Sequence, residues 1–116
     1  MAQRLVIISG GYQTGKMPLA RRFMSEDAAL VCVHRDTLRD ALITPIDEGH
    51  MTWVMASIAD RLLHLGHSAI VVAWNLEPSD RIIWSDIAWE YEIPLEWFDV
   101  SLPEVAALIP PIQAAA

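Results

Sequence analysis

The chain has 116 residues, a formal net charge of −7 at pH 7 and a hydrophobic fraction of 53%. This length suits one domain with one core, and the acidic balance argues against broad nonspecific binding to nucleic acid, which depends on Lys and Arg. One cysteine excludes a disulfide framework, and no apolar run is long enough for a membrane helix. Because the N-terminal residues also leave no room for a signal peptide, we expect a cytoplasmic protein.

Apolar runs and helical spacings alternate along the chain. Short runs rich in β-branched residues predict strands, and apolar residues that recur every three or four positions predict helices. In chain order the predicted elements are a strand at 5–9, a loop at 10–15, a helix at 18–24, a strand at 29–33, a helix at 36–42, a loop at 43–49, a helix at 52–65, a strand at 68–73, a helix at 78–91, a strand at 95–100, a helix at 103–108 and a tail at 110–116.

Helix ends and helix faces follow from the same reading. Asp36 is predicted to be an N-cap, and Gly66 is predicted to end the preceding helix at its C′ position. The residues predicted to face the core from the two long helices are Val54, Met55, Ile58, Ala59, Leu62, Leu63, Ile82, Ile83, Ile87 and Ala88. The alternation predicts an α/β fold with a parallel sheet covered on both sides, as one domain over residues 1–109.

The loop after the first strand carries a phosphate-binding pattern. Its residues are Gly10, Gly11, Tyr12, Gln13, Thr14, Gly15 and Lys16. Glycines let backbone N–H groups converge on a polyphosphate, the following helix directs its positive end there, and the lysine reaches the terminal phosphates. The alternative is a glycine-rich turn without a ligand, but the position between a buried strand and a helix favours binding of ATP or another NTP.

The position after the lysine departs from that pattern. A Ser or Thr normally follows, because its hydroxyl coordinates Mg²⁺. Here the residue is Met17, whose thioether is no ligand for this hard cation, and Pro18 follows it. The sequence therefore predicts a nucleotide cradle that extends to Met17, with no metal-ligating side chain, and Mg²⁺ only if transfer occurs.

Charged residues follow the second strand. They are His34, Arg35, Asp36 and Arg39, and ligands of open α/β sheets bind at the carboxyl ends of strands. Asp36 can serve as general base for an acceptor hydroxyl while Arg39 holds an acceptor phosphate. The alternative is an N-cap aspartate with a solvated arginine.

With these motifs the chain resembles the P-loop 5′-hydroxyl polynucleotide kinases and, more loosely, other P-loop kinases. The resemblance uses 10–16, 35–39 and the run Ala69 to Pro78, with Arg81 and Trp84 following, and extends to about Glu104. It implies a three-layer P-loop NTPase fold with a sheet in the order 2-3-1-4. It also implies that Lys16 contacts the donor phosphates, that Asp36 activates a nucleic acid 5′-hydroxyl, and that Arg39 holds the acceptor's phosphate.

Three departures accompany the resemblance. The first is Met17. The second is Ala73-Trp74, which stands where the family has an acidic and a small polar residue before Asn75. The third is the end of the chain, since no Lys or Arg follows Arg81 to form the arginine-bearing lid, and no fifth strand is predicted. We expect either a natural short form or a shortened piece of a longer protein.

The histidines and tryptophans give weaker indications of a functional site. The four histidines, His34, His50, His64 and His67, match no zinc pattern and are expected at the surface. Trp74 is predicted at the ligand edge, so it joins Arg35 and Asn75 as an edge of the site or an acceptor contact. Trp84 and Trp89 are predicted packing or dimer contacts, and the apolar excess suggests that a homodimer covers some of the surface.

Three functions remain open from the sequence. The first is a polynucleotide kinase that transfers the γ-phosphate of ATP or another NTP to a nucleic acid 5′ end, slowly or with arginines from another subunit. The second is a descendant without catalysis that binds nucleotide or phosphate, or that serves as an interaction module. The third is a P-loop kinase for a small metabolite, which shares the donor site and differs in its acceptor pocket.

Overall fold

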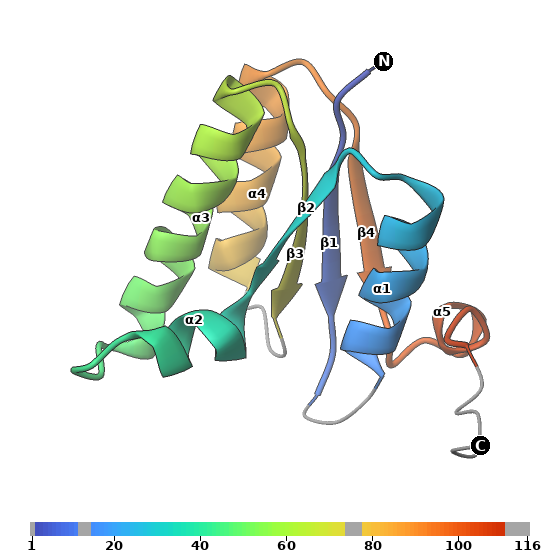
Figure 1. Cartoon of the computed structure of the whole chain (residues 1–116), viewed down its shortest axis with the longest axis horizontal. Helices are drawn as coiled ribbons and strands as arrows, with labels where there is room; N and C mark the ends of the chain where they lie inside the picture. Colours follow the sequence, from blue (N-terminus) through green and yellow to red (C-terminus); the bar gives the residue numbers. More distant parts are fainter. Residues whose placement is uncertain (1, 12–14, 74–77, 111–116) are drawn as a thin grey trace.

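The computed structural model describes residues 2–11, 15–73 and 78–110, which form a parallel sheet between helices (Figure 1). The strands are β1 (Leu5–Ser9), β2 (Leu30–His34), β3 (Ser68–Ala73) and β4 (Leu95–Asp99). All neighbouring pairs are parallel, and the order is β2-β3-β1-β4. The predicted α/β class, parallel sheet and strand order are therefore confirmed. Because parallel strands need crossovers, a helical connection follows each of the first three strands.

The helices cover both faces of the sheet. They are α1 (Lys16–Glu26), α2 (Arg35–Ala41), α3 (Glu48–His64), α4 (Pro78–Glu90) and α5 (Pro103–Ala106). Figure 1 shows α3 and α4 on one face and α1 and α5 on the other, with α2 beyond the end of β2. This arrangement gives three layers with the sheet in the middle.

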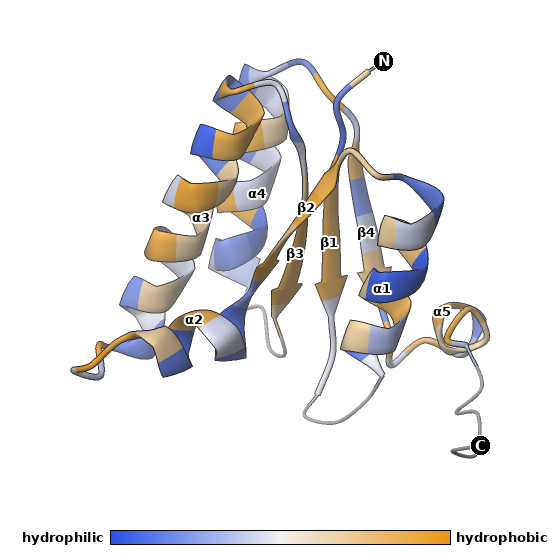
Figure 2. Cartoon of the chain, viewed as in Figure 1, coloured by the Kyte–Doolittle hydropathy of each residue, from blue (hydrophilic) through white to orange (hydrophobic). Residues whose placement is uncertain are grey.

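Alternation along the central strands supplies two cores. In β1, Leu5 and Ile7 pack toward α3 and α4, whereas Val6 and Ile8 pack toward α1 and α5. All four side chains are fully buried, as expected for a strand with helices on both faces. Figure 2 accordingly shows much of β1, β2 and β3 in the colours of hydrophobic residues.

The start of α3 differs from the prediction. The loop expected at 43–49 is shorter, because α3 begins at Glu48 rather than at residue 52. Asp47 is the N-cap, and its Oδ1 accepts a hydrogen bond of 2.8 Å from the Gly49 amide. A glycine in the first turn masked this start, because apolar spacing becomes regular only from Met51 onward.

Two other local predictions were wrong. Asp36 is not the N-cap of α2, since His34 occupies that position without a side-chain cap bond and Asp36 lies in the first turn. Ile82 is 62% exposed rather than inward, because Trp84 fills the core position of α4 and is completely buried. Ile58 also lies more exposed than its spacing suggested, at 36%.

The predicted stop at Gly66 is confirmed. Gly66 has φ +96°, which is accessible to glycine at little cost, and its amide donates to the Leu63 carbonyl. The amide of His67 donates to the Leu62 carbonyl at 3.0 Å. This pair of bonds is a Schellman motif, which satisfies the last carbonyls of α3.

The surface retains large apolar side chains. The most exposed of them are Ile43, Trp89, Trp53, Leu65 and Ile82. None of the helices within residues 2–11, 15–73 and 78–110 is long and apolar enough to cross a bilayer. Apart from Pro110, the predicted tail lies outside the described residues.

Candidate functional site

The carboxyl ends of the strands meet at one edge of the sheet, at the bottom of Figure 1. The phosphate-loop residues follow Ser9 at the end of β1, and α2 follows His34 at the end of β2. Only β3 separates these two strands. The two motifs found in the sequence therefore occupy the same edge, one strand apart.

Gly15 is the N-cap of α1 and has the left-handed angles φ 90° and ψ 18°. A Cβ added there would lie 2.7 Å from Cδ1 of Ile109. Both the backbone and the space therefore require glycine, and the segment after α5 packs against the end of the loop. Gly10 and Gly11 lie in the described part of the loop, whereas Tyr12, Gln13 and Thr14 lie outside it.

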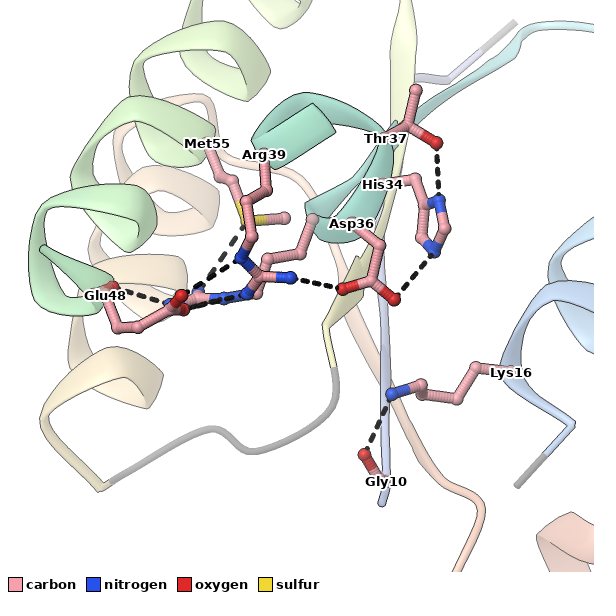
Figure 3. A network of polar contacts seen from close by, with 9 residues as sticks. Gly10, Lys16, His34, Asp36, Thr37, Arg39, Glu48 and Met55 are labelled. Carbon is pink, nitrogen blue, oxygen red and sulfur yellow. Dashed lines mark hydrogen bonds and ion pairs between the residues drawn. The ribbon is translucent and has the colours of Figure 1, made fainter. Parts of the chain in front are cut away.

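Lys16 is the first residue of α1, and its Nζ donates a 3.0 Å hydrogen bond to the Gly10 carbonyl across the loop. Burial lowers the pKa of this ammonium, and the negative charge of Asp36 opposes that shift. Figure 3 shows the Lys16 and Asp36 side chains directed toward the same space from different elements. A cation at the N-terminus of an 11-residue helix creates a site for an anion.

Met17 is the second residue of α1, and its side chain is half-buried. It packs with the core between the sheet and α1 and lines an apolar pocket beside β2. A thioether in that position does not fit a resident Mg²⁺. Within the described ranges, no group of three or more His, Cys, Asp or Glu residues is arranged to hold a metal ion.

Asp36 and Arg39 lie on the first and second turns of α2 and contact each other. Arg39 NH1 donates to Asp36 Oδ1 at 2.7 Å. On the other side, Nε2 of His34 lies 3.9 Å from Asp36 Oδ2, while Nδ1 of the same ring lies 2.7 Å from the Thr37 hydroxyl oxygen. The carboxylate is thus oriented by its own helix, and 41% of the Asp36 side chain is open to solvent.

Glu48 is a member of the site that the sequence analysis did not identify. Its carboxylate accepts hydrogen bonds from Arg39 Nε at 3.0 Å and from Arg39 NH2 at 2.9 Å. It also accepts from Arg35 at 2.8 Å and 3.1 Å. These bonds, those of Arg39 first and those of Arg35 second, lower the pKa of Glu48 to about 2. An acidic residue in the first turn of a helix after an Asp N-cap was the available signal.

Arg35 has a different environment from Arg39. It is buried, with 7% of its surface exposed, and NH1 donates to the Thr52 hydroxyl at 3.1 Å. Its NH2 donates to the backbone carbonyl of Glu48 at 2.5 Å. Arg35 therefore joins α2 to the first turns of α3, whereas Arg39 is 35% exposed and reachable by a ligand. Figure 3 shows the Arg39 guanidinium between Glu48 on one side and Asp36 on the other.

The end of β4 adds a second group of contacts that sequence reasoning missed. Trp97 Nε1 donates to Ser9 Oγ at 3.0 Å, directly before the phosphate loop. The guanidinium carbon of Arg81 lies 4.8 Å from the centroid of the Trp97 ring, which is a cation–π contact. Arg81 also contributes to lowering the pKa of Asp99, after the hydrogen bonds from Ser101.

The remaining predicted site residues are placed as follows. Trp74 and Asn75 lie outside the described residues. His50, His64 and His67 are exposed, as expected, and His34 is half-buried beside Asp36. Cys32 is also half-buried, and burial raises the pKa of its thiol, which suits a packing residue.

No protein-family model and no curated protein matches the sequence. Solved structures do match. A chain of the Pnkp1/Rnl/Hen1 complex superposes with a TM-score of 0.70 at 24% identity, covering 98% of this chain and 41% of that one. A second structure, of the Pnkp1/Rnl/Hen1 RNA repair complex, gives 0.69 at 25% identity, with 91% and 36% covered. The APS kinase CysC of Mycobacterium tuberculosis gives 0.62 at 18% identity, with 84% and 73% covered.

These similarities establish the fold. The chain spans less than half the length of the chains that it matches in the two repair-complex structures. A four-stranded parallel sheet in the order β2-β3-β1-β4, with a glycine loop and lysine after β1, is the architecture of a P-loop kinase. The described chain therefore has the P-loop kinase fold.

Proposed function

We propose that this protein is a P-loop kinase that transfers the γ-phosphate of ATP or another NTP to the 5′-hydroxyl of a nucleic acid. The observation that carries the proposal is the convergence of Lys16 and Asp36, whose charges interact across one edge of the sheet. A donor cation and a carboxylate on either side of one space are what in-line phosphoryl transfer requires.

The donor half comprises the loop and the start of α1. The triphosphate lies against the loop backbone at the helix N-terminus, where Lys16 exchanges its bond to the Gly10 carbonyl for a phosphate oxygen. Because Met17 supplies no hydroxyl, Mg²⁺ enters as the complex with the nucleotide, as part of the substrate. Lys16 then stabilises charge on the phosphate groups as the bond to the leaving nucleoside diphosphate breaks.

The acceptor half comprises α2 and Glu48. Asp36 takes the proton of the attacking hydroxyl, whose oxygen forms the new bond to the γ-phosphorus. Arg39 holds a phosphate of the acceptor in a forked contact, which its planar guanidinium favours. Glu48 positions Arg39 through two hydrogen bonds and fixes Arg35 beneath it. The similarity to chains of an RNA repair complex supports a nucleic acid acceptor.

A second function is favoured by Met17. A chain without a metal-binding hydroxyl after the lysine can bind nucleotide or phosphate without transferring it. That function retains the donor half and makes Asp36 a structural partner of Arg39. A small-metabolite acceptor differs from the proposal only in what meets Arg39. For each of these functions we propose a cytoplasmic location, where ATP is available and the thiol of Cys32 stays reduced.

The test is incubation with ATP labelled at the γ-phosphate, Mg²⁺ and a 5′-hydroxyl oligonucleotide. We expect labelled oligonucleotide from the wild type and none from a Lys16→Ala, Asp36→Ala double variant. An equal signal from both proteins contradicts the proposal. Calorimetric titration with ATP separates the second function, since binding without transfer supports a nucleotide-binding module and no heat with or without Mg²⁺ excludes both.

A further inference from the structure

A pocket of about 440 Å³ lies beside β2, the edge strand of the sheet that leads into Asp36. Its walls come from both faces of the sheet, with Met17 from α1, Leu38 and Ala41 from α2, and Ile58 from α3. The volume is at the small end of the range for small-molecule sites, about 300 to 1,000 Å³. The walls are mostly apolar, so the pocket suits a flat, weakly polar group.

The pocket adjoins the acceptor half of the site through His34 and the start of α2. His34 and Thr37 both line it, and Asp36 lies between them in the chain. The His34 ring spans the two, since Nδ1 contacts the Thr37 hydroxyl at 2.7 Å and Nε2 faces Asp36 Oδ2 at 3.9 Å. A ligand that fills the pocket therefore contacts the same imidazole ring that faces the Asp36 carboxylate.

We propose that this pocket binds the terminal nucleobase of the acceptor strand, which places the 5′-hydroxyl of the same nucleotide at Asp36. The inference rests on the proposed function. A base is flat and apolar on its faces, and Met17, Leu38 and Ile58 offer aliphatic and thioether surfaces to them. Arg39, partly exposed on the same helix, is the cation that matches the phosphate following that nucleotide.

This assignment also explains the residue after the phosphate-binding lysine. Met17 is half-buried and belongs to the pocket wall, so the side chain that replaces the usual hydroxyl contacts the acceptor base. Among the described residues that line the pocket, the side chains with nitrogen or oxygen are His34 and Thr37, which are already bonded to each other. We therefore expect weak selection among bases and a preference for single strands, because a base must leave its stack to enter.

The test compares two single-stranded oligonucleotides, one with an ordinary 5′-terminal nucleotide and one whose 5′-terminal sugar lacks a base. We expect kcat/KM to be about tenfold lower for the abasic strand, which is within the range for loss of one stacked base. The kcat/KM for a blunt duplex with a 5′-hydroxyl should also be lower than that for the ordinary single strand. Equal kcat/KM for the two single strands would overturn the inference.

Two variants alter the pocket without touching the charged residues. Ala41→Phe fills it and Ile58→Ala removes part of a wall, so both should bring the ratio between the two oligonucleotides toward one. Ala107→Phe, at an exposed alanine after α5, is the matched control and should preserve the ratio. Circular dichroism and urea unfolding check that each variant folds, and a ratio unchanged in both pocket variants contradicts the inference.

A binding measurement keeps this inference separate from the proposed function. Nuclear magnetic resonance titration with cytidine 3′-monophosphate and with ribose phosphate, in excess ADP, needs no transfer chemistry. If transfer is absent but the base-bearing ligand binds more tightly, and Ala41→Phe abolishes that difference, the pocket assignment holds and the kinase proposal fails. If Ala41→Phe instead alters only the sedimentation of the protein, the pocket is a contact between copies and the inference is wrong.

Discussion

Different kinds of interaction stabilise the residues at the ends of β1 and β2, although only β3 lies between these two strands. At the end of β2, two arginines and two carboxylates bond to one another, with Glu48 joining Arg35 and Arg39. At the end of β1, the described hydrogen bond of Lys16 goes to a backbone carbonyl instead. The acceptor side is thus assembled by ion pairs, and the donor side by backbone geometry.

This difference determines what each ligand must displace. An acceptor phosphate competes with Glu48 for Arg39, because both of the Arg39 bonds to Glu48 are charge-assisted. A donor phosphate replaces a neutral carbonyl on Lys16 and also meets the positive end of α1. We therefore expect the donor to bind more readily, and the acceptor side to contribute order and selectivity.

The largest expected effect is the loss of phosphoryl transfer when the general base of the acceptor side is removed. Asp36→Asn keeps the size of the side chain and an oxygen for Arg39, but removes the base. Transfer should fall by about 10²- to 10⁴-fold while the Kd for ATP stays unchanged, as measured by single-turnover kinetics and calorimetry. Asp40→Asn, at an exposed residue of the same helix, is the control. A loss of ATP affinity in Asp36→Asn would show that the sides are not independent.

The next effect concerns donor binding. Lys16→Ala should weaken ATP binding by about 10- to 100-fold, because it removes a charge-assisted bond to phosphate. Calorimetry measures the change, and Arg61→Ala removes an equal charge from an exposed site at the end of α3 as control. Unchanged affinity in Lys16→Ala would mean that the loop does not hold the triphosphate.

A smaller effect tests the ion pairs of the acceptor side. The pKa of Glu48 is lowered from 4.5 to about 2, so its charged form stabilises the fold above pH 4.5 and that contribution is lost as pH falls toward 2. Because 58% of the side chain is exposed, solvent screening reduces the benefit, and we expect Glu48→Gln to cost about 1 kcal/mol at pH 7.

Urea unfolding of Glu48→Gln and wild type at pH 7, 4.5 and 2.5 measures this contribution. The difference between the two proteins should shrink as the pH falls below 4.5, because Glu48 then takes up a proton in the unfolded wild type before it does so in the folded protein. Glu104→Gln, in the first turn of α5 and without the arginine contacts, should show no such trend. A constant difference across the three pH values would argue against the ion pairs as its source.

The smallest expected effect concerns an exposed tryptophan away from the donor and acceptor sides. Trp89 is 85% exposed, so Trp89→Ser should change the free energy of unfolding by no more than about 0.5 kcal/mol. If a homodimer covers this surface, as the apolar excess of the sequence suggests, sedimentation at high concentration should show weaker self-association in the variant. Trp84→Ala, at a fully buried indole, should instead cost about 3–5 kcal/mol. Identical sedimentation of Trp89→Ser and wild type would exclude Trp89 from a dimer contact.

Much of the architecture was accessible from local patterns. Apolar runs identified β1 and β3, which are buried at every position, because a strand covered on both faces is apolar along most of its length. Gly66 marked a helix end because its left-handed backbone is costly for other residues. The start of α3 and the exposure of Ile82 were not predicted. The first depends on Asp47 acting as the N-cap, and the second depends on Trp84 occupying the core position of α4.

The amino-acid sequence by itself determined the strands, the phosphate-loop pattern and the presence of Asp36 and Arg39, because each depends on residues close together in the chain. Only the tertiary structure brought Glu48 to the two arginines, 9 and 13 residues away, and joined Met17 to Leu38 and Ile58 in one pocket. Such contacts form when packed helices bring distant residues together, and no local spacing records that geometry. The loop and its lysine can be recognised in the sequence, whereas the residues that orient Arg39 and Asp36 can be identified only in the tertiary structure.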